Sequence, residues 1–178
     1  FLFINKLEKE HIRNLDKKIA IIYRNYSEPN NKKTILEIQK ACKKNGRKFY
    51  LSNNLKLALN LNLDGVYLPA FNKNLNTAQI NTRKNFNIIG SAHTINEIRI
   101  KEKQGVKLIF ISPIFKTKKN KKFLNTIKFN YLASKTSKKI IALGGITSKN
   151  LNKLKMSQIN GFAGISYFKN NDKIKILK

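Results

Sequence analysis

Short apolar runs alternate with amphipathic stretches along the whole chain. Several of these runs are rich in β-branched residues and are apolar at consecutive positions, which is typical of strands buried on both faces of a parallel sheet. Eight strands are predicted on this basis, at Leu2–Ile4, Ile19–Tyr23, Lys48–Leu51, Val66–Leu68, Asn87–Ile89, Lys107–Ile111, Ile140–Leu143 and Gly161–Ser166.

Helical patterns lie between these strands. In Thr34–Lys44 the apolar residues recur at helical spacing, and Gly46 follows as a C-terminal cap. Thr94 and Glu97 form a capping box at the start of another helix. Shorter helices are predicted at His11–Lys17, Leu55–Leu59, Thr77–Lys84 and Thr126–Ala133, and over Leu151–Lys155 with Thr147 or Ser148 as the N-cap.

The alternation of strands and helices predicts the fold. A strand followed by a helix, repeated eight times, indicates a parallel sheet with right-handed crossovers, and eight such units predict a closed (β/α)8 TIM barrel. The chain has 178 residues, whereas such barrels usually have about 250, so its helices and loops must be short. No linker interrupts residues 1–178, which we expect to form a single domain. An open doubly wound sheet is the alternative.

The charge of the chain is strongly positive. It carries 37 Lys and Arg against 9 Asp and Glu, a formal net charge of +28, which suggests a nucleic-acid partner. However, the basic residues are mostly Lys, and Asn and Ile are also abundant. Codons for all three are AT-rich, so a coding bias explains the composition, and the lysines do not form one stripe. We therefore expect only non-specific attraction to polyanions.

The apolar runs are of strand length, so no membrane-spanning segment is predicted. The run at Phe1–Lys6 is too short for a signal peptide, and a cytoplasmic location is expected. Cys42 is the one cysteine, which excludes an internal disulfide, and its place on an apolar helix face favours a role in the core. No His, Asp and Glu cluster has metal-site spacing, so no metal site is predicted. A homo-oligomer stays open.

In a barrel of this type the functional site lies at the carboxyl ends of the strands, and phosphate is frequently bound by the loops after strands seven and eight. Gly144 and Gly145 follow strand seven, and Ile165 and Ser166 lie at the end of strand eight. Glycines allow a ligand to approach bare backbone N–H groups. These four residues are therefore candidates for phosphate binding. A tight turn without a ligand is the alternative for the glycine pair.

Strand five leads into Ser91 and His93. A histidine at this place can exchange a proton near neutral pH, so His93 is the candidate catalytic residue and Ser91 a candidate contact to substrate. The alternative is that His93 caps its own loop. The other histidine, His11, lies in a polar helix start and is expected to be solvated.

Basic residues follow two further strands. Arg24 lies at the end of strand two, and Thr117 opens a loop after strand six that contains Lys119 and Lys121. These residues can clamp a phosphate; alternatively, the lysines are a solvated run of charge. All four are candidate contacts to a phosphorylated ligand.

Several motifs resemble those of a known superfamily. Their order and spacing are similar to those of the thiamine phosphate synthase/thiazole tautomerase (TenI-like) superfamily, at Gly90–Thr94, Ser112–Thr117, Ala142–Ile146, Gly161–Ser166, Phe49–Leu68 and Tyr23–Arg24. The resemblance covers nearly the whole chain and implies a (β/α)8 barrel. It also implies a role in thiamine biosynthesis, with a phosphorylated thiazole as the small-molecule partner.

The synthase branch joins hydroxymethylpyrimidine diphosphate to hydroxyethylthiazole phosphate and uses Mg²⁺. Its pattern has Gln and Lys at the strand-two end, where this chain has Ile22 and Tyr26, and Asn-Asp after strand three, where this chain has Ser52-Asn53. A second acidic ligand after strand four is replaced within Pro69–Asn72. The resemblance therefore implies loss of the Mg²⁺ ligands.

The thiazole-phosphate half of the pattern is largely kept, and the resemblance assigns it to Thr117, Gly144, Gly145, Ile165 and Ser166. This combination looks more like the tautomerase branch, in which a proton donor and acceptor aromatises a thiazole carboxylate phosphate without a metal, and His93 matches the histidine of that branch.

Two alternatives stay open. One is a working synthase with different Mg²⁺ ligands. The other is a non-catalytic relative that binds polyanions or nucleic acid.

Overall fold

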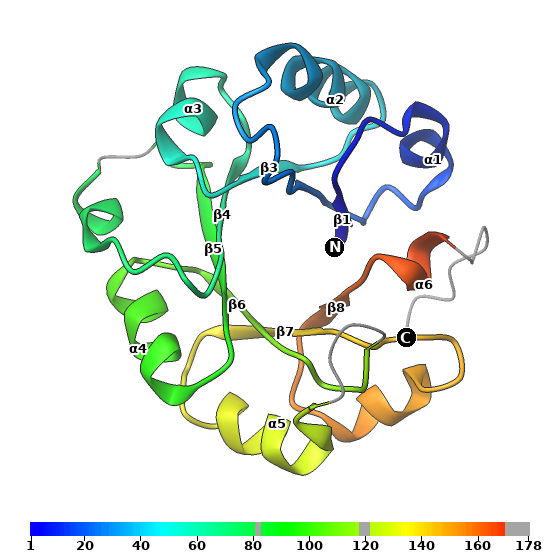
Figure 1. Cartoon of the computed structure of the whole chain (residues 1–178), viewed down its shortest axis with the longest axis vertical. Helices are drawn as coiled ribbons and strands as arrows, with labels where there is room; N and C mark the ends of the chain where they lie inside the picture. Colours follow the sequence, from blue (N-terminus) through cyan, green and yellow to red (C-terminus); the bar gives the residue numbers. More distant parts are fainter. Residues whose placement is uncertain (81–82, 118–121, 170–178) are drawn as a thin grey trace.

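The computed structural model describes residues 1–80, 83–117 and 122–169. Eight parallel strands form one sheet in which each strand pairs with the next along the chain. A bridge between Leu2 and Gly164 joins the last strand to the first and closes the sheet into a barrel (Figure 1). The (β/α)8 barrel prediction is thus confirmed, and the open doubly wound alternative is wrong. The strands are β1 (Leu2–Ile4), β2 (Ile21–Tyr23), β3 (Phe49–Ser52), β4 (Gly65–Leu68), β5 (Asn87–Ala92), β6 (Leu108–Ile111), β7 (Lys139–Leu143) and β8 (Gly161–Ala163).

Helical segments surround the barrel, and most of them are short, as the length of the chain requires. The α-helices are α1 (Lys9–Asn14), α2 (Lys32–Lys44), α3 (Leu55–Asn60), α4 (Ile95–Lys103), α5 (Asn125–Ala133) and α6 (Ser166–Lys169). Two crossovers use 3₁₀ turns instead, η1 (Leu75–Gln79) and η2 (Leu151–Met156). Within the described residues no helix is both long and apolar enough to span a membrane.

The structure corrects several predicted boundaries. The α-helix expected at Thr77–Lys84 is the 3₁₀ turn η1, which ends at Gln79. Strand β5 does not end at Ile89 but continues to Ala92, and β8 ends at Ala163. The helix expected at His11–Lys17 is α1, which begins at Lys9 and ends at Asn14.

The predicted N-cap after strand seven is also wrong. Neither Thr147 nor Ser148 caps a helix there, because the η2 turn begins only at Leu151. Instead, Asn150 accepts a hydrogen bond from the backbone N–H of Thr147 and donates one to the carbonyl of Gly145. One asparagine side chain thus bonds to the backbone of the loop at both Gly145 and Thr147.

Each strand contributes one buried residue to the inside of the barrel. These residues are Phe3, Ile22, Tyr50, Tyr67, Ile89, Phe110, Ile141 and Ala163. Three of their rings pack edge to face, with centroid distances of 5.1 Å between Phe3 and Tyr67 and 5.5 Å between Tyr67 and Phe110. The barrel is therefore a filled core, and a ligand can reach only its ends.

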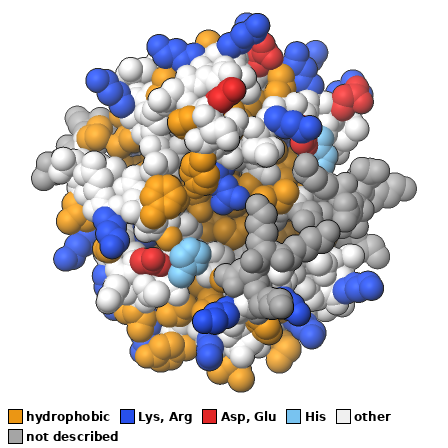
Figure 2. All heavy atoms as spheres, in the orientation of Figure 1, with side chains coloured by type: hydrophobic (Ala, Val, Ile, Leu, Met, Phe, Trp, Pro, Cys, Tyr) orange, Lys and Arg blue, Asp and Glu red, His pale blue; other side chains and the backbone are white. Residues whose placement is uncertain are grey.

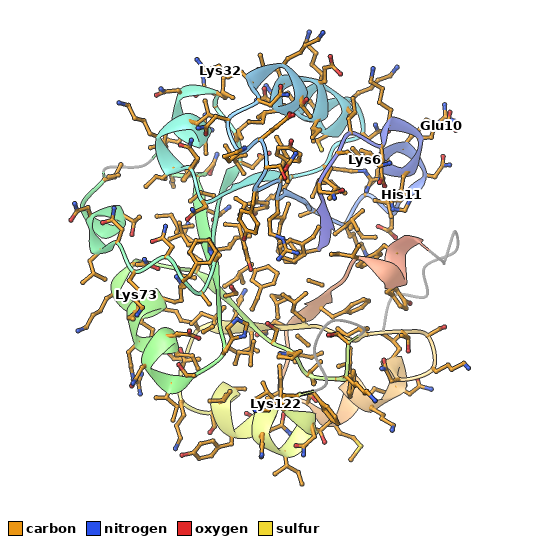
Figure 3. The ribbon with its side chains drawn as sticks, in the orientation of Figure 1. Lys6, Glu10, His11, Lys32, Lys73 and Lys122 are labelled. Carbon is orange, nitrogen blue, oxygen red and sulfur yellow. The ribbon has the colours of Figure 1, made fainter. Side chains whose placement is uncertain are left out.

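The alternate residues of the strands point outward and pack against the helices in a second apolar cluster. Cys42 of α2 is fully buried there, which confirms its predicted place in the core. Burial also raises the pKa of the Cys42 thiol to about 12. His11 lies on α1 outside the strands (Figure 3), and it is only partly solvated, because the residue is half-buried and its Nε2 is buried with no hydrogen-bond partner among the described residues.

Candidate functional site

The carboxyl end of the barrel interior is polar. Side chains on a strand alternate between the two faces, so the residue two positions after each inward-facing core residue also points inward. At this upper level the eight inward positions carry Asn5, Arg24, Ser52, Pro69, Ser91, Ser112, Leu143 and Ile165. Five of these eight side chains can bind polar groups, whereas the level below is almost entirely apolar. A layer of polar side chains, called the polar floor below, thus lies above the buried apolar residues inside the barrel, called the plug.

A pocket of about 320 Å³ opens above this floor. It brings together Arg24 from the end of β2, Ser91 from β5 and His93 from the loop before α4, as the barrel prediction requires. Its lining consists of Arg24, Tyr26, Tyr67, Pro69, Ala70, Phe71, Ser91, His93, Glu97, Ser112 and Leu143. Viewed along the barrel, hydrophobic side chains gather near the centre of the face, and Lys and Arg side chains surround them (Figure 2).

The His93 ring is held in one orientation. Its Nδ1 lies 2.7 Å from the carbonyl oxygen of Ser112 and 3.3 Å from the Ser112 hydroxyl. A carbonyl oxygen can only accept a hydrogen bond, so Nδ1 carries the proton and the lone pair of the neutral ring is on Nε2. The backbone N–H of His93 donates to Glu97 Oε2 at 2.6 Å. Thr94 caps α4 by accepting from the backbone N–H of Glu97, but the Glu97 carboxylate bonds to the N–H of His93 instead of that of Thr94, so only one half of the predicted capping box forms.

Arg24 supplies positive charge to the pocket. Its guanidinium is half-buried and stacks on two rings, 4.8 Å from the centroid of Phe3 and 6.0 Å from that of Tyr26. Within the described residues neither a carboxylate nor a hydrogen-bond acceptor pairs with this guanidinium. Its donors are thus available to an anion that enters the pocket.

Tyr67 and Ser91 connect the plug to the floor. The Tyr67 hydroxyl is hydrogen-bonded to the Ser91 side chain, and burial raises the pKa of Tyr67 to about 12. The phenol is therefore protonated at neutral pH. The hydroxyl of Ser52, on the neighbouring strand β3, is buried and has no hydrogen-bond partner within the described ranges of the chain, so it is a further polar group at this level.

The loop after β7 is shaped by its two glycines. Gly144 and Gly145 have φ values of 95° and 70°, in the left-handed region that favours glycine. The loop also packs tightly on the β6 loop, because the backbone N–H groups of Ile114 and Phe115 donate to the carbonyls of Leu143 and Gly144. Among the residues that the structure describes, no acceptor pairs with the N–H groups of Gly144 and Gly145. Their donors therefore remain available.

The structure describes the other predicted phosphate contacts only in part. Thr117 is the last described residue before residue 122 in the β6 loop and is half-buried. Ile165 follows the closing bridge at Gly164 and is 42% exposed. Ser166 begins α6, but its side chain is not described. Lys119 and Lys121 lie outside the described residues.

The segments after β3 and β4, to which the synthase pattern gives metal-binding carboxylates, hold two amides that bond to each other. The Nδ2 of Asn72, after β4, donates to Oδ1 of Asn53, after β3, at 2.7 Å. The Oδ1 of Asn72 is itself occupied, because it accepts from Gln104 Nε2 at 3.1 Å and from the backbone N–H of Asn74 at 3.0 Å. Mg²⁺ needs negatively charged oxygen ligands that are free to turn toward it. These residues therefore do not fit the ion. In the described part of the chain no three His, Cys, Asp or Glu side chains come together either.

Sequence reasoning missed two aromatic residues at the rim of the pocket. Tyr26 and Phe71 are 54% and 62% exposed, and their ring centroids lie 5.9 Å apart. Tyr26 follows β2 and Phe71 follows β4. Large exposed aromatic residues at strand ends were the available signal, but only the fold shows that these two meet.

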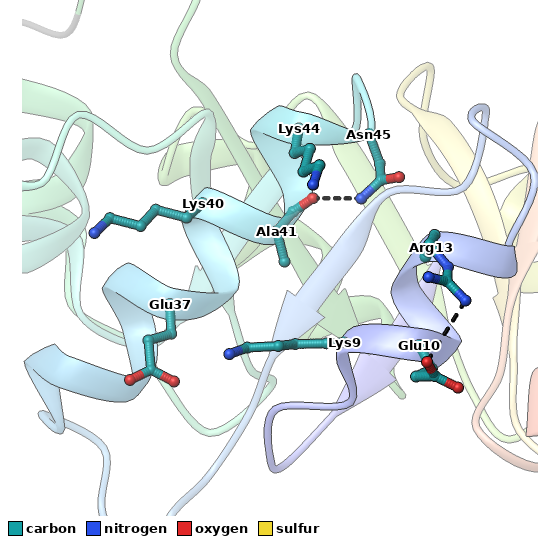
Figure 4. A pocket seen from close by; sticks show the side chains of 8 residues that line it. All are labelled: Lys9, Glu10, Arg13, Glu37, Lys40, Ala41, Lys44 and Asn45. Carbon is teal, nitrogen blue, oxygen red and sulfur yellow. Dashed lines mark hydrogen bonds and ion pairs between the residues drawn. The ribbon is translucent and has the colours of Figure 1, made fainter.

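A second depression lies away from the strand ends. It has a volume of about 350 Å³ and runs between α1 and α2 on the outside of the barrel (Figure 4). The long side chains of Lys9, Arg13, Glu37 and Lys40 line it. It contains no strand-end residue and neither histidine, so the pocket at the barrel mouth is the candidate site.

The fold and the pocket together define a class: this is a (β/α)8 barrel protein with a polar pocket at the carboxyl ends of its strands. Comparison with known proteins gives the family. A family model described as Thiamine monophosphate synthase matches residues 10–168. The chain belongs to this thiamine monophosphate synthase (TenI) family of thiamine biosynthesis.

Individual relatives agree with this assignment. The chain is 33% identical over 162 residues to a thiamine-phosphate synthase of Prochlorococcus marinus, a match that covers 86% of this chain and 45% of that protein. It is 30% identical over 168 residues to the thiamine-phosphate synthase of Flavobacterium johnsoniae, covering 89% of this chain and 79% of that protein. A Helicobacter pylori thiamine-phosphate synthase is 32% identical over 139 residues, which are 76% of this chain and 63% of that protein. The chain thus spans less than two thirds of the Prochlorococcus and Helicobacter proteins.

A solved structure supports the fold. The thiamine phosphate pyrophosphorylase of Pyrococcus furiosus superposes with a TM-score of 0.73 at 20% identity, covering 93% of this chain and 83% of that one.

Proposed function

We propose that the mouth of the barrel binds a phosphorylated thiazole and that His93 moves a proton on its ring. The observation that carries the proposal is the orientation of His93. Its Nδ1–H is committed to the Ser112 carbonyl, while within the described residues Nε2 has no protein partner. A fixed tautomer with an available lone pair above a polar floor is what a general base requires.

The proposed reaction is an internal proton transfer. Nε2 of His93 removes a proton from one ring atom of the bound thiazole carboxylate phosphate, and the resulting imidazolium returns it to another atom. Atoms and charge balance within one substrate, and the step needs neither a metal nor a second reactant. The Ser112 carbonyl stabilises the transient imidazolium through the Nδ1–H bond.

The phosphate is proposed to bind at the loops after β7 and β8. The available N–H groups of Gly144 and Gly145 support this placement. With the phosphate there, the ring lies over Ser91 and Ser112 and near His93, and Arg24 faces any further anionic group of the ligand.

The first test is calorimetric titration with hydroxyethylthiazole phosphate at physiological salt. We expect saturable binding by the parent protein and loss of binding in Gly145→Asp, because the new carboxylate repels the phosphate and its Cβ forces the loop after β6 to move. Gly105→Asp, at a similar φ of 73° but with open space around it, controls for the added charge and the backbone strain, and this variant should bind like the parent. Absence of saturable binding by the parent protein would contradict the proposal.

A second measurement separates binding from chemistry. In His93→Asn we expect turnover of the thiazole carboxylate phosphate to fall by about 10²- to 10⁴-fold, the usual contribution of a general base, with unchanged affinity for hydroxyethylthiazole phosphate. A variant that keeps full turnover would show that another group transfers the proton.

A synthase is the second candidate. It is favoured by the name of the curated relatives and by Arg24, whose guanidinium is available to a diphosphate. It predicts Mg²⁺-dependent formation of thiamine phosphate from hydroxymethylpyrimidine diphosphate and hydroxyethylthiazole phosphate. Purified protein that forms no thiamine phosphate from both substrates would exclude it.

A further inference from the structure

A lysine is completely buried beside the pocket. Lys101 of α4 has 0% of its surface exposed. Its Nζ donates to the carbonyl oxygens of Pro69 at 2.9 Å and Asn72 at 2.7 Å, and to Gln104 Oε1 at 2.9 Å. An ammonium group has three hydrogens, so every one of them is used. Two of the three acceptors belong to the loop after β4.

Gln104 extends the same contact. It is also 0% exposed, and its Nε2 donates to the carbonyls of Asn72 at 3.1 Å and Asn74 at 2.9 Å. Together, Lys101 and Gln104 bind the carbonyls of three residues of the loop from the C-terminal end of α4. The Asn72 side chain then continues the network to Asn53, so the loops after β3 and β4 are joined to one helix.

This loop forms one wall of the candidate site. Pro69, Ala70 and Phe71 line the pocket. The carbonyls of Pro69 and Asn72, which accept from Lys101, lie at the two ends of this segment. The helix that anchors the loop begins two residues after His93. His93 thus lies just before the start of one helix, and residues near the end of the same helix hold the neighbouring β4 loop, which is part of the pocket wall.

Filling space does not explain a lysine at this position. A methionine has a similar length, but it would leave the carbonyls of Pro69 and Asn72 buried without that donor, which is unfavourable. We propose that Lys101 is a positioning residue that, with Gln104, fixes the loop Pro69–Asn74 and thereby the distance between the Phe71 wall and His93. The role in ligand binding rests on the proposed function, but the anchoring of the loop does not.

The charge of Lys101 makes the anchor dependent on pH. Burial lowers the pKa of Lys101 to about 8, an effect that the nearby Glu97 carboxylate partly opposes. The loop presents only uncharged acceptors to it. Above this pKa the amine has two hydrogens for three acceptors, so the network that anchors the loop loses one hydrogen bond.

Global stability changes in the opposite direction. The folded pKa is below the ordinary value of 10.5, so between about pH 8 and 10.5 the unfolded state binds more protons at this group. Its contribution to the free energy of unfolding therefore rises with pH. Loosening of the loop in this window would thus not be a sign of global unfolding.

The test uses a fluorescent reporter on the loop. The chain contains no Trp and Phe71 is 62% exposed, so Phe71→Trp introduces a single indole on the anchored wall. In this background we expect Lys101→Met to raise the acrylamide quenching constant at pH 7 by about twofold, because the loop opens locally. Lys103→Met, an exposed lysine of the same helix, is the matched control and should leave quenching unchanged. Equal quenching in Lys101→Met and the parent would overturn the proposal.

A second readout needs no change at Lys101. In Phe71→Trp alone, quenching should rise with a midpoint near pH 8 while the circular dichroism of the fold is unchanged. If Lys101→Met does not fold, Gln104→Leu in the same background replaces it, because this variant removes the donor to the carbonyls of Asn72 and Asn74; equal quenching in Gln104→Leu and the parent would overturn the proposal. Neither measurement uses a ligand, so the result is independent of whether the thiazole proposal holds.

Discussion

Both the backbone conformation and the close neighbouring atoms disfavour a side chain at Gly144 and Gly145. A Cβ added to Gly144 would lie 2.7 Å from Cβ of Pro113, and one added to Gly145 would lie 2.5 Å from the carbonyl oxygens of Phe115 and Lys116. These distances mean that the loop after β6 must move if either residue is replaced. The two loops at the barrel mouth are therefore shaped together.

A pair of alanine variants separates the two effects. Gly105 has a positive φ with open space around it, whereas Gly144 has a positive φ and the Pro113 contact. We expect Gly105→Ala to lower the free energy of unfolding by about 1 kcal/mol through backbone strain. Gly144→Ala should lower it by a further ~1–3 kcal/mol through overpacking. Urea denaturation measures both, and equal losses would show that the β6 loop accommodates the methyl group.

Single residues of the candidate site were predictable to different extents. Arg24, Ser91 and His93 were found because each follows a recognisable strand, and the barrel then brings them into one pocket. Lys101 and Gln104 were not found, because a lysine on an amphipathic helix is usually solvated and only the packing of α4 on the β4 loop buries it. The available signal was helical spacing: Lys101 lies three residues after Ile98 and so on the buried face of α4, whereas its exposed neighbour Lys103 does not.

At the scale of elements, the start of α4 links helix stability to the site. Thr94 Oγ1 accepts from the N–H of Glu97, and Glu97 Oε2 accepts from the N–H of His93. The side chains that accept hydrogen bonds from N–H groups at the start of the helix therefore also hold the backbone of the proposed catalytic residue.

The effect of the Thr94 cap on His93 can be tested by comparison with the cap of a helix that is remote from the pocket. Asn31 caps α2 by accepting from the N–H of Thr34, and it does not line the pocket. We expect Thr94→Ala and Asn31→Ala each to lower the free energy of unfolding by about 1 kcal/mol. Only Thr94→Ala should also reduce turnover, by roughly 3- to 10-fold, because it frees His93. Equal turnover in the two variants would show that the cap of α4 does not influence the proposed catalytic residue.

The strands were predicted better than the helices, for a physical reason. Consecutive apolar residues identify strands buried on both faces, and all eight were located. The crossovers η1 and η2 are short and 3₁₀, and helical spacing over so few residues does not distinguish them from α-helices. Strand β5 was predicted too short because Gly90 and Ser91 have low strand propensity, although pairing with β6 keeps them extended.

For the whole molecule, the excess of positive charge is the dominant electrostatic feature. Lys32, Lys73 and Lys122 lie on different sides of the barrel (Figure 3). Two ion pairs join described residues to each other, Arg13–Glu10 and Arg99–Glu102, and both span one helical turn. The fold is thus stable against a self-repulsion that its own carboxylates hardly reduce.

Screening this repulsion should stabilise the protein. Raising NaCl from about 0.05 to 0.5 M shortens the Debye length from about 14 to about 4 Å. We expect the melting temperature to rise by about 2–4 °C, equivalent to ~1 kcal/mol for a chain of this size. Thermal unfolding with KCl at the same ionic strength should give the same shift. A melting temperature that falls with salt would show that the two ion pairs outweigh the repulsion.

The closure of the barrel between Leu2 and Gly164 has a consequence for the order of folding. Every other strand pair joins neighbours in the chain, so those pairs can form one after another at a small entropic cost. The bridge between β1 and β8 joins the two ends of the described barrel, so we expect it to form last. The proposed phosphate loops flank this seam, and partly folded chains therefore lack the site until the final strand docks.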